Sequence, residues 1–482
     1  MMSIANLAPA RVWKNFYALT QIPRPSKHEG KVVEYVTNFG KQLGLETIVD
    51  GIGNVIIRKP ATKGMENRKG VILQTHLDMV PQKNSDTVHD FEKDPIIAYV
   101  DGEWVRAKGT TLGADNGIGV AMAMAVLEAT DLPHGPVEAL FTIDEETGMT
   151  GAFGLKPGLF KGEILINLDS EDEGELYVGC AGGLDGAFVF NGTEEPAPAG
   201  YEAFRLSVKG LKGGHSGMEI SLGRGNANKI LFRVLYQLSN EFGLRLSSVD
   251  GGSLRNAIPR EAFATLLLPA GKAAAATEVV AALFRTIAAE LSVTDEGLKI
   301  ALDAAETPGK VVDEKTQKAL ILSVYACPSG VMRMSDSVPE LVETSNNLAI
   351  VKLENGVARI SCLLRSSVDS AKDDLAAMMG AVFTLAGAEV KFTGGYPGWK
   401  PNPASLVLQT MKKVYQKLYN KTPEVKAIHA GLECGLLGGV YPHWDMISCG
   451  PTIRSPHSPD ERVKIDTVEK CWNFLVETLK EV

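Results

Sequence analysis

The spacing of apolar residues predicts where helices and strands lie in the first part of the chain. Residues 71–75, 138–143 and 163–168 form short, strongly apolar runs rich in β-prone residues, whereas residues 33–43 repeat their apolar positions with the period of an amphipathic helix. Helix-like and strand-like segments alternate throughout this part. The alternation predicts an α/β domain with a mostly parallel central sheet.

A different pattern begins near Asp185. Two sets of segments follow, each resembling a split β-α-β unit, and the second contains a hairpin turned by Glu354-Asn355-Gly356. We expect two tandem copies of such a module, which together form an inserted α+β domain. The first domain resumes where Gly and Pro cluster, near residues 394–403. The predicted domains are residues 1–185 with 395–482, and an insert of residues 186–394.

Composition narrows the class of protein. A chain of 482 residues is too long for one ordinary hydrophobic core. With 49 Lys and Arg and 58 Asp and Glu, its net charge is negative, which argues against electrostatic binding to nucleic acid or to an anionic membrane. No apolar stretch approaches the roughly 20 residues that span a bilayer, and no secretory signal opens the chain. The 6 cysteines are scattered, as in a reduced compartment. We expect a cytoplasmic protein whose thiols lie mostly in the core.

Side chains that can bind metal ions stand at the ends of several predicted strands. Because open α/β sheets bind ligands at the carboxyl ends of their strands, these side chains should converge on one edge of the sheet. A further aspartate stands at the start of the buried helix predicted over residues 118–127. The set is His76, Asp78, Glu145, Glu146, Asp169 and His457, with Asp115. Two imidazoles and three carboxylates suit a pair of divalent ions, usually zinc.

Taken singly, these segments have simpler interpretations. His76-Leu77-Asp78 could be a capped surface turn, and Asp144-Glu145-Glu146 could be a solvated acidic turn. The functional alternative is that Asp78 fixes the tautomer of His76, and that one of two adjacent glutamates binds metal while the other moves protons. Their joint position at one sheet edge favours the functional interpretation.

The order and spacing of these motifs resemble the M20 family of zinc peptidases, and most closely its aminoacyl-histidine dipeptidase branch. The resemblance extends nearly end to end. The motifs are Thr75-His76-Leu77-Asp78-Met79-Val80, Gly113-Ala114-Asp115-Asn116-Gly117, Asp144-Glu145-Glu146-Thr147-Gly148, Asn167-Leu168-Asp169, Lys212-Gly213-Gly214-His215-Ser216-Gly217, His429-Ala430-Gly431-Leu432-Glu433-Cys434-Gly435, Gly450-Pro451 and Ser455-Pro456-His457-Ser458.

The resemblance implies a role for each residue of the set. Asp115 would bridge two Zn²⁺ ions, for which Co²⁺ or Mn²⁺ could substitute. His76 and Asp169 would complete the coordination of one ion, and Glu146 and His457 would complete that of the other. Glu145 would be the general base toward the metal-activated water, and Asp78 would orient His76. The peptide bond after Asp115 would be cis.

The insert corresponds to the family's lid domain. His215 resembles the lid histidine that stabilises the oxyanion, although it could be a turn histidine, and Asn256 resembles a substrate-binding residue. Arg365 would bind the substrate's terminal carboxylate, or it could be a surface residue paired with an acid. Glu433 would bind the substrate's ammonium group, or it could be a buried structural carboxylate. The doubled lid could mimic a dimer contact within one chain, and a homodimer through the lid is the alternative.

The function implied by the resemblance is hydrolysis of short peptides by a di-zinc dipeptidase, including Xaa-His dipeptides such as β-alanyl-histidine. Two alternatives share the metal centre and differ in the pocket: an amidohydrolase acting on N-acyl amino acids, and a tripeptidase. A metal-binding protein without turnover is a third. In every case the expected partner is a small molecule, neither nucleic acid nor membrane.

Overall fold

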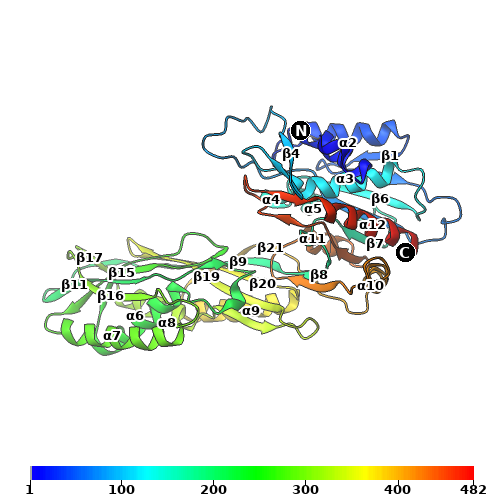
Figure 1. The fold of residues 1–482 in the computed structure, drawn as a ribbon. Helices are drawn as coiled ribbons and strands as arrows, with labels where there is room; N and C mark the ends of the chain where they lie inside the picture. Colours follow the sequence, from blue (N-terminus) through cyan, green and yellow to red (C-terminus); the bar gives the residue numbers. More distant parts are fainter. Residues whose placement is uncertain (1–2) are drawn as a thin grey trace. The chain divides into compact units, whose positions relative to one another are not determined.

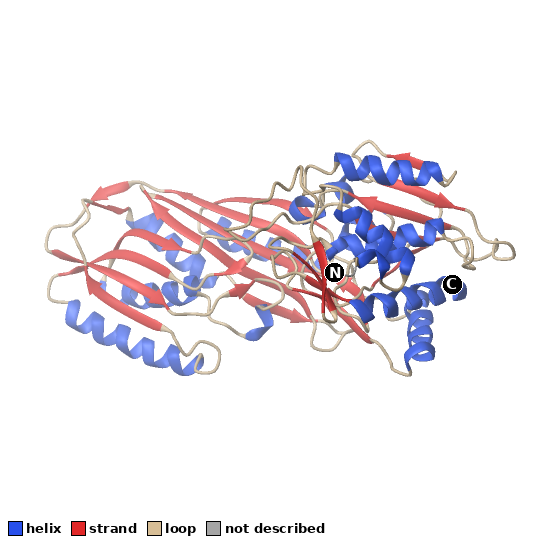
Figure 2. Cartoon of the chain, turned by 45° about the horizontal axis from the view of Figure 1, so that its top comes forward, coloured by secondary structure: helices blue, strands red, loops and turns tan. Residues whose placement is uncertain are grey.

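The computed structural model describes residues 3–482, which form two compact units (Figures 1 and 2). The first unit extends to Gly179 and includes Trp399–Ala427 and Leu432–Val482, and the second comprises Cys180–Gly398 and Ile428–Gly431. No helix among residues 3–482 is long and apolar enough to cross a membrane. All six cysteine side chains are buried, as expected of core thiols.

An eight-stranded sheet forms the centre of the first unit, and its central strands are parallel. Its order is β1-β2-β6-β3-β7-β23-β8-β22. The parallel strands are β6 (Val137–Thr142), β3 (Val71–His76), β7 (Ile164–Asn167) and β23 (Asp445–Ser448). Antiparallel pairs flank them, through β2 (Val55–Lys59) with β1 (Glu46–Val49) on one side and β8 (Glu175–Cys180) on the other, and β22 (Glu424–Ile428) forms the edge. Every residue of β3, β6 and β7 is buried, as expected of strands covered on both faces.

Helices cover this sheet, and one of them is apolar all round. All residues of α3 (Ala114–Glu128) except Asp115 and Glu128 are buried, which confirms the helix predicted from the apolar run. It contacts both β3 and α1 (Ala10–Thr20) (Figure 1). The other helices of this unit are α2 (Gly30–Gln42), α4 (Glu145–Gly148), α5 (Thr150–Gly154), α10 (Leu406–Tyr419), α11 (Glu433–Val440) and α12 (Ile465–Glu481).

A small antiparallel sheet in the first unit holds the loop that carries His457. Its order is β24-β25-β5-β4, from β24 (Ile453–Arg454), β25 (Arg462–Lys464), β5 (Trp104–Ala107) and β4 (Ala98–Asp101). The pair β24–β25 is a hairpin whose tip contains His457, because Arg454 is the register partner of Arg462. The hairpin therefore projects this histidine from a paired base.

The second unit contains a nine-stranded antiparallel sheet with four helices on one face (Figure 1). Its order is β16-β11-β15-β13-β19-β20-β9-β21, with β18 (Gly330–Met334) on β19. The strands are β9 (Gly182–Asn191), β11 (Tyr201–Lys209), β13 (Arg245–Gly251), β15 (Ala262–Pro269), β16 (Lys299–Ala304), β19 (Val342–Glu354), β20 (Val357–Ser366) and β21 (Glu389–Tyr396). The helices are α6 (Ala227–Phe242), α7 (Ala273–Glu290), α8 (Glu314–Ala326) and α9 (Asp369–Leu385). Two short pairs, β10 (Glu194–Pro196) with β17 (Lys310–Val312) and β12 (Gly214–His215) with β14 (Ala257–Ile258), lie outside this sheet.

The sheet joins two split β-α-β modules, as the sequence predicts. One module contains β11, α6, β13, β15, α7 and β16, and the other contains β9, α8, β19, β20, α9 and β21. The expectation of tandem modules was wrong, because β9 precedes the first module along the chain while its partners β20 and β21 follow it. The first module is thus nested inside the second. Asn355 and Gly356 both have positive φ, 51° and 77°, so the predicted turn between β19 and β20 is confirmed.

Candidate active site

The carboxyl edge of the parallel sheet brings together all five side chains expected to bind metal. His76 ends β3, and its Nε2 atom lies 3.2 Å from Asp115 Oδ1 and 3.3 Å from Asp169 Oδ1. The other oxygen of Asp115, Oδ2, lies 3.2 Å from His457 Nε2. The same His457 atom is 2.9 Å from Glu146 Oε2. Asp115 therefore presents one carboxylate oxygen to each of two groups of side chains.

Both groups have donor atoms that fit a divalent cation. His76, Asp115 and Asp169 offer atoms within 4.8 Å of one another, and so do Asp115, Glu146 and His457. Two carboxylate oxygens, Glu146 Oε1 and Asp169 Oδ1, are buried and have no hydrogen-bond partner within residues 3–482. A buried carboxylate oxygen without a donor or cation is costly. The residues present thus fit two cations that share Asp115.

The two histidines experience a strong negative field. Burial lowers the pKa of His76, but the carboxylates of Asp169 and Asp115 outweigh it and raise that pKa well above its usual value. Hydrogen bonds to Asp115 and Glu146 raise the pKa of His457 to about 11. These carboxylates therefore require positive charge beside them, which protons or metal ions can supply.

Asp78 connects the histidine to the glutamates. Its Oδ1 atom lies 3.2 Å from His76 Nδ1 and accepts the backbone N–H of Glu145 at 3.0 Å, while Oδ2 accepts the N–H of Glu146 at 3.2 Å and the hydroxyl of Ser26 at 2.8 Å. Burial alone would raise the pKa of Asp78, but the hydrogen bond with His76 lowers it to about 2. One buried anion thus orients the imidazole and holds the turn of both glutamates.

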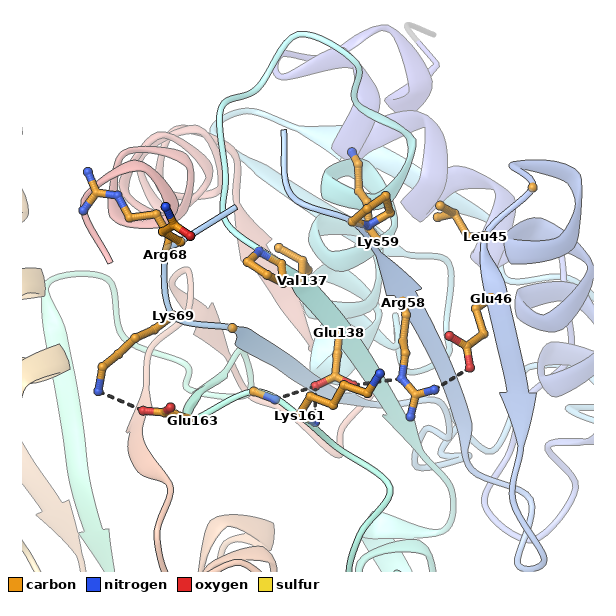
Figure 3. Close-up of a pocket in the computed structure, with 16 residues that line it drawn as sticks. Leu45, Glu46, Arg58, Lys59, Arg68, Lys69, Val137, Glu138, Lys161 and Glu163 are labelled. Carbon is orange, nitrogen blue, oxygen red and sulfur yellow. Dashed lines mark hydrogen bonds and ion pairs between the residues drawn. The ribbon is translucent and has the colours of Figure 1, made fainter. Parts of the chain in front are cut away.

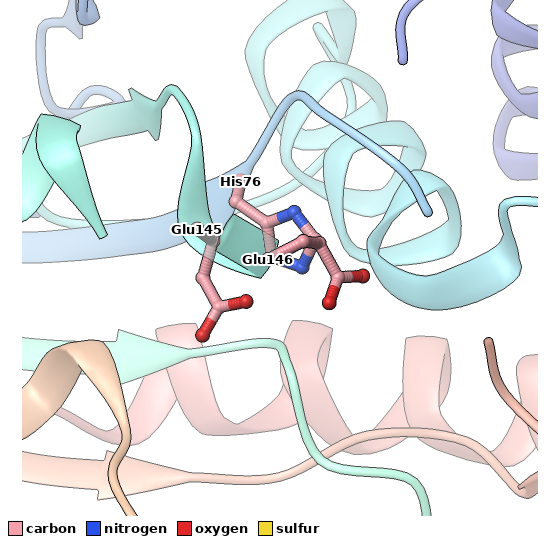
Figure 4. A group of neighbouring side chains, drawn as sticks. All are labelled: His76, Glu145 and Glu146. Carbon is pink, nitrogen blue, oxygen red and sulfur yellow. The ribbon is translucent and has the colours of Figure 1, made fainter. Parts of the chain in front are cut away.

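Glu145 and Glu146 open α4 and direct their carboxylates to the side of His76 (Figure 4). The preceding residue, Asp144, is left-handed with φ 52° and accepts hydrogen bonds from the hydroxyls of Thr147 and Thr150, which fixes this turn. Burial raises the pKa of the Glu145 carboxyl well above its usual range. The peptide bond between Asp115 and Asn116 is cis, as the resemblance implies.

Glu433 begins α11 and is fully buried. Its Oε2 atom accepts hydrogen bonds from Gln74 Nε2 at 2.6 Å and from the hydroxyl of Thr142 at 2.7 Å, and burial raises its pKa to about 8. Its Oε1 atom is buried without a hydrogen-bond partner in the described chain. One oxygen thus has a structural role, and the other stays available.

In the second unit, His215 and Asn256 lie side by side. His215 in β12 pairs with Ala257 in β14, and Asn256 O accepts the N–H of Ser216 at 2.9 Å. The Nδ1 atom of His215 accepts the backbone N–H groups that follow it, at 3.2 and 3.1 Å. Burial, with Arg365 nearby, lowers the pKa of His215. The ring is therefore neutral with its proton on Nε2.

Arg365 belongs to the same part of the second unit. It is 5% exposed, its guanidinium donates to the Tyr396 hydroxyl at 3.5 Å, and no ion pair joins it to a carboxylate of residues 3–482. The alternative of a surface arginine paired with an acid does not fit this environment. A Cβ atom on Gly217 would lie 3.1 Å from His215 Cε1 and 3.2 Å from Arg365 Nε, so both side chains surround that glycine.

Several polar residues near these groups have no role predicted from the sequence. Arg24, Glu29, His429 and Glu461 are buried, and Ser26 is partly buried. His429 binds Ser345 Oγ through Nε2 at 2.7 Å, and Glu29 accepts the N–H of Asp144 at 3.1 Å. The signal in the sequence is a charged residue close to a proline, as in Pro23-Arg24-Pro25 and in Pro459-Asp460-Glu461 after His457.

Two groups of side chains that could each hold a cation share an aspartate, with a further glutamate beside them at the carboxyl edge of an α/β sheet, and this arrangement is typical of a metal-dependent hydrolase. The comparisons with known proteins agree. Residues 72–481 match peptidase family M20/M25/M40. The cytosol non-specific dipeptidase of Escherichia coli (strain K12) is 49% identical to the chain over 482 residues, covering 100% of this chain and 99% of that protein.

Solved structures give the same result. The aminoacylhistidine dipeptidase from Vibrio alginolyticus has a TM-score of 0.96 and 49% identity, covering 100% of this chain and 98% of that one. A tripeptidase from Staphylococcus aureus, 15% identical with a TM-score of 0.56 and 98% of each chain covered, shares the fold alone. The chain belongs to the M20/M25/M40 family of peptidases. The predicted family, α/β fold with an α+β insert, and enzyme class of metallopeptidase are confirmed.

One prediction concerns the pH dependence of stability. Burial lowers the pKa of His429 from 6.5 to about 3, so the imidazole is neutral in the folded chain and protonates first in the unfolded chain as the pH falls. This destabilises the fold progressively between pH 6.5 and pH 3. At pH 5 the cost is about 2 kcal/mol relative to pH 7. His429→Gln should therefore lose about 2 kcal/mol less unfolding free energy than the wild type over that interval.

The measurement is urea unfolding followed by circular dichroism at pH 7 and pH 5. His28→Gln, which changes an exposed imidazole, is the control. Identical losses in the wild type and His429→Gln would contradict the prediction.

Proposed function

We propose that the chain is a cytoplasmic dipeptidase that uses two zinc ions and accepts Xaa-His dipeptides such as β-alanyl-histidine. The observation that carries the proposal is the position of Asp115, whose two oxygens face His76 and His457 at 3.2 Å each. The names of the relatives from Escherichia coli and Vibrio alginolyticus, each 49% identical over the whole chain, support the substrate class and the compartment.

Each proposed zinc ion has a defined set of residues. His76, Asp115 and Asp169 would hold one, and Asp115, Glu146 and His457 the other. Two bound cations would supply Lewis acidity toward the scissile carbonyl and a lowered pKa for the attacking water.

Glu145 is the proposed general base and acid. Its carboxylate takes a proton from the attacking water and delivers that proton to the departing amine. Burial raises the pKa of Glu145. The residue therefore holds the proton more strongly than an exposed carboxylate would, and the departing amine is the group that accepts it. The backbone N–H of Glu145 donates to Asp78 Oδ1 at 3.0 Å, which holds Glu145 in place. The same oxygen orients the His76 ring.

Residues of the second unit and Glu433 are the proposed substrate-binding groups. His215 has its Nε2 proton available, so it can donate to the oxygen that becomes negative after attack. Arg365 is a buried cation without an acidic partner in the described chain, and a peptide's terminal carboxylate would supply one. Asn256, whose backbone carbonyl accepts the N–H of Ser216 next to His215, would add its side-chain amide. Glu433 Oε1 would accept a hydrogen bond from the substrate's ammonium group.

A substrate panel with metal analysis tests the proposal. The purified chain should contain about two zinc ions, lose activity after chelation and regain it when zinc returns. We expect dipeptides with free termini to react at least about tenfold faster, in kcat/KM, than tripeptides and N-acetyl amino acids. Preference for tripeptides would indicate a tripeptidase, preference for N-acetyl amino acids an amidohydrolase, and zinc binding without turnover of any substrate a metal-binding protein.

The division of roles between the adjacent glutamates gives a second prediction. Glu145→Gln should keep both zinc ions while kcat falls about 100- to 10,000-fold, because the proton acceptor is lost. Glu146→Gln should lose one zinc ion, because it removes a ligand charge. Metal content by mass spectrometry and steady-state kinetics check both variants. The same zinc content and residual activity in the two variants would refute the assignment.

Arg365 gives a third prediction. Arg365→Gln should lower kcat/KM about 10- to 100-fold for dipeptides with a free carboxylate, and little for their C-terminal amides, because a charge-assisted pair is lost. Arg359→Gln is the matched control, because Arg359 is an exposed arginine on the same strand, β20. An equal loss for acid and amide substrates would show that Arg365 does not bind the carboxylate.

A further inference from the structure

Glu461 is a buried carboxylate that binds a complete run of backbone N–H groups. It is 2% exposed. Its Oε2 atom accepts from Leu112 N at 2.7 Å and Gly113 N at 2.9 Å, and its Oε1 atom accepts from Ala114 N at 2.7 Å and Asp115 N at 3.2 Å. The first N–H groups of a helix have no partner within it, and α3 begins at Ala114. A side chain distant in sequence thus satisfies the segment that carries Asp115.

The same residue lies in the loop that carries His457. The loop is the tip of the β24–β25 hairpin, and the N–H of Glu461 donates to Ser458 O at 2.9 Å. His457 has a positive φ of 59°, and its side chain is 52% exposed. An exposed ring at a hairpin tip needs an anchor to keep a fixed position. Glu461, four residues along, attaches that tip to the Asp115 segment.

Arg24 acts on the opposite side of the segment. It is 3% exposed, and its guanidinium donates to Leu77 O at 2.9 Å, Asp78 O at 2.8 Å and Gly113 O at 2.5 Å. Gly113 has a φ of 69°, and a Cβ atom there would lie 2.6 Å from Arg24 Nη2, so the close approach requires glycine. Burial lowers the pKa of Arg24, and among the nearby carboxylates Glu461 opposes that shift most strongly. Two buried side chains therefore hold the chain around Gly113, because Arg24 binds its carbonyl oxygen and Glu461 binds its N–H group.

We propose that Glu461, supported by Arg24, is a positioning residue that fixes His457 relative to Asp115 and so sets the zinc affinity of the site the two residues share. The inference rests on the proposed di-zinc centre and extends it to a residue outside the ligand set. Residues that orient metal ligands change metal affinity about 10- to 100-fold when they are removed. The Nε2 atom of His457 and Oδ2 of Asp115 are 3.2 Å apart, so small movements of the hairpin change the site directly.

The test compares Glu461→Gln and Glu461→Asp in the full chain. The four backbone N–H groups donate to two carboxylate oxygens, whereas glutamine has one acceptor oxygen. Its NH₂ group would face two of the N–H donors without a hydrogen bond. Aspartate keeps the charge beside Arg24 but is one methylene shorter, so it provides a second variant if the first fails to fold. Zinc affinity, measured by chelator competition, should fall about 10- to 100-fold in both. In the zinc-free protein, hydrogen exchange of the amides of residues 112–115 should be faster than in the wild type.

Glu138 offers a matched control. It is also a buried carboxylate, 5% exposed, that accepts two backbone N–H groups, from Lys161 at 2.9 Å and Gly162 at 2.8 Å, and pairs with Arg58 at 2.9 Å. It stands near the start of β6, at the opposite end of the strand from the site, beside a cavity of about 690 Å³ (Figure 3). Glu138→Gln should lower stability while zinc affinity stays at the wild-type value.

The outcomes separate the inference from the proposed function. Wild-type zinc affinity in both Glu461 variants, or an equal loss in Glu138→Gln, would reduce Glu461 to a structural residue and overturn the inference. Zinc binding by the wild type without peptide turnover would overturn the proposed function alone. A wild-type chain that binds no zinc would overturn both.

Discussion

The excess of buried negative charge at one edge of the sheet is the constraint on which this structure depends. Asp78, Asp115, Glu145, Glu146 and Asp169 gather around two imidazoles, in surroundings that raise the pKa of Asp169 to about 6. Carboxylates in such surroundings repel one another and favour the neutral form unless cations or donors compensate them. Much of the neighbouring structure supplies that compensation.

Asp78 and Glu461 show two ways in which the fold supplies it. Asp78 is compensated by an imidazole, a hydroxyl and two backbone N–H groups. Glu461 accepts four backbone N–H groups, although burial still raises its pKa to about 7. By contrast, Glu146 Oε1 lacks a hydrogen-bond partner among the residues described, and Asp169 Oδ1 has no hydrogen bond there and only the ion pair with His76 Nε2, at 3.3 Å. The compensated carboxylates belong to the framework, and the uncompensated ones face the positions proposed for metal ions.

The sequence indicates the residues of the proposed metal site, but not the residues that hold them in position. Three of the proposed metal ligands stand at or shortly after the ends of apolar strands, so the periodicity that reveals β3, β6 and β7 also places His76, Glu146 and Asp169 at a common edge. Glu461 and Arg24 escaped because their partners are backbone atoms far along the chain, and side-chain patterns carry no information about those. The tandem arrangement of the modules failed for a related reason: β9 has a local pattern that does not indicate which strand it pairs with.

The nested modules have a consequence for synthesis of the chain. β9 leaves the ribosome before the first module, yet its hydrogen-bonding partners β20 and β21 emerge only after that module and α8 are complete. The inner module has its own strands and helices, so its pairings can form while β9 still has unpaired edges. The central sheet of the first unit is completed later still, because β23 pairs with β7 only after the whole second unit has been synthesised. Such long-range pairing slows folding, and until it is complete β7 presents an open edge to which other chains can bind.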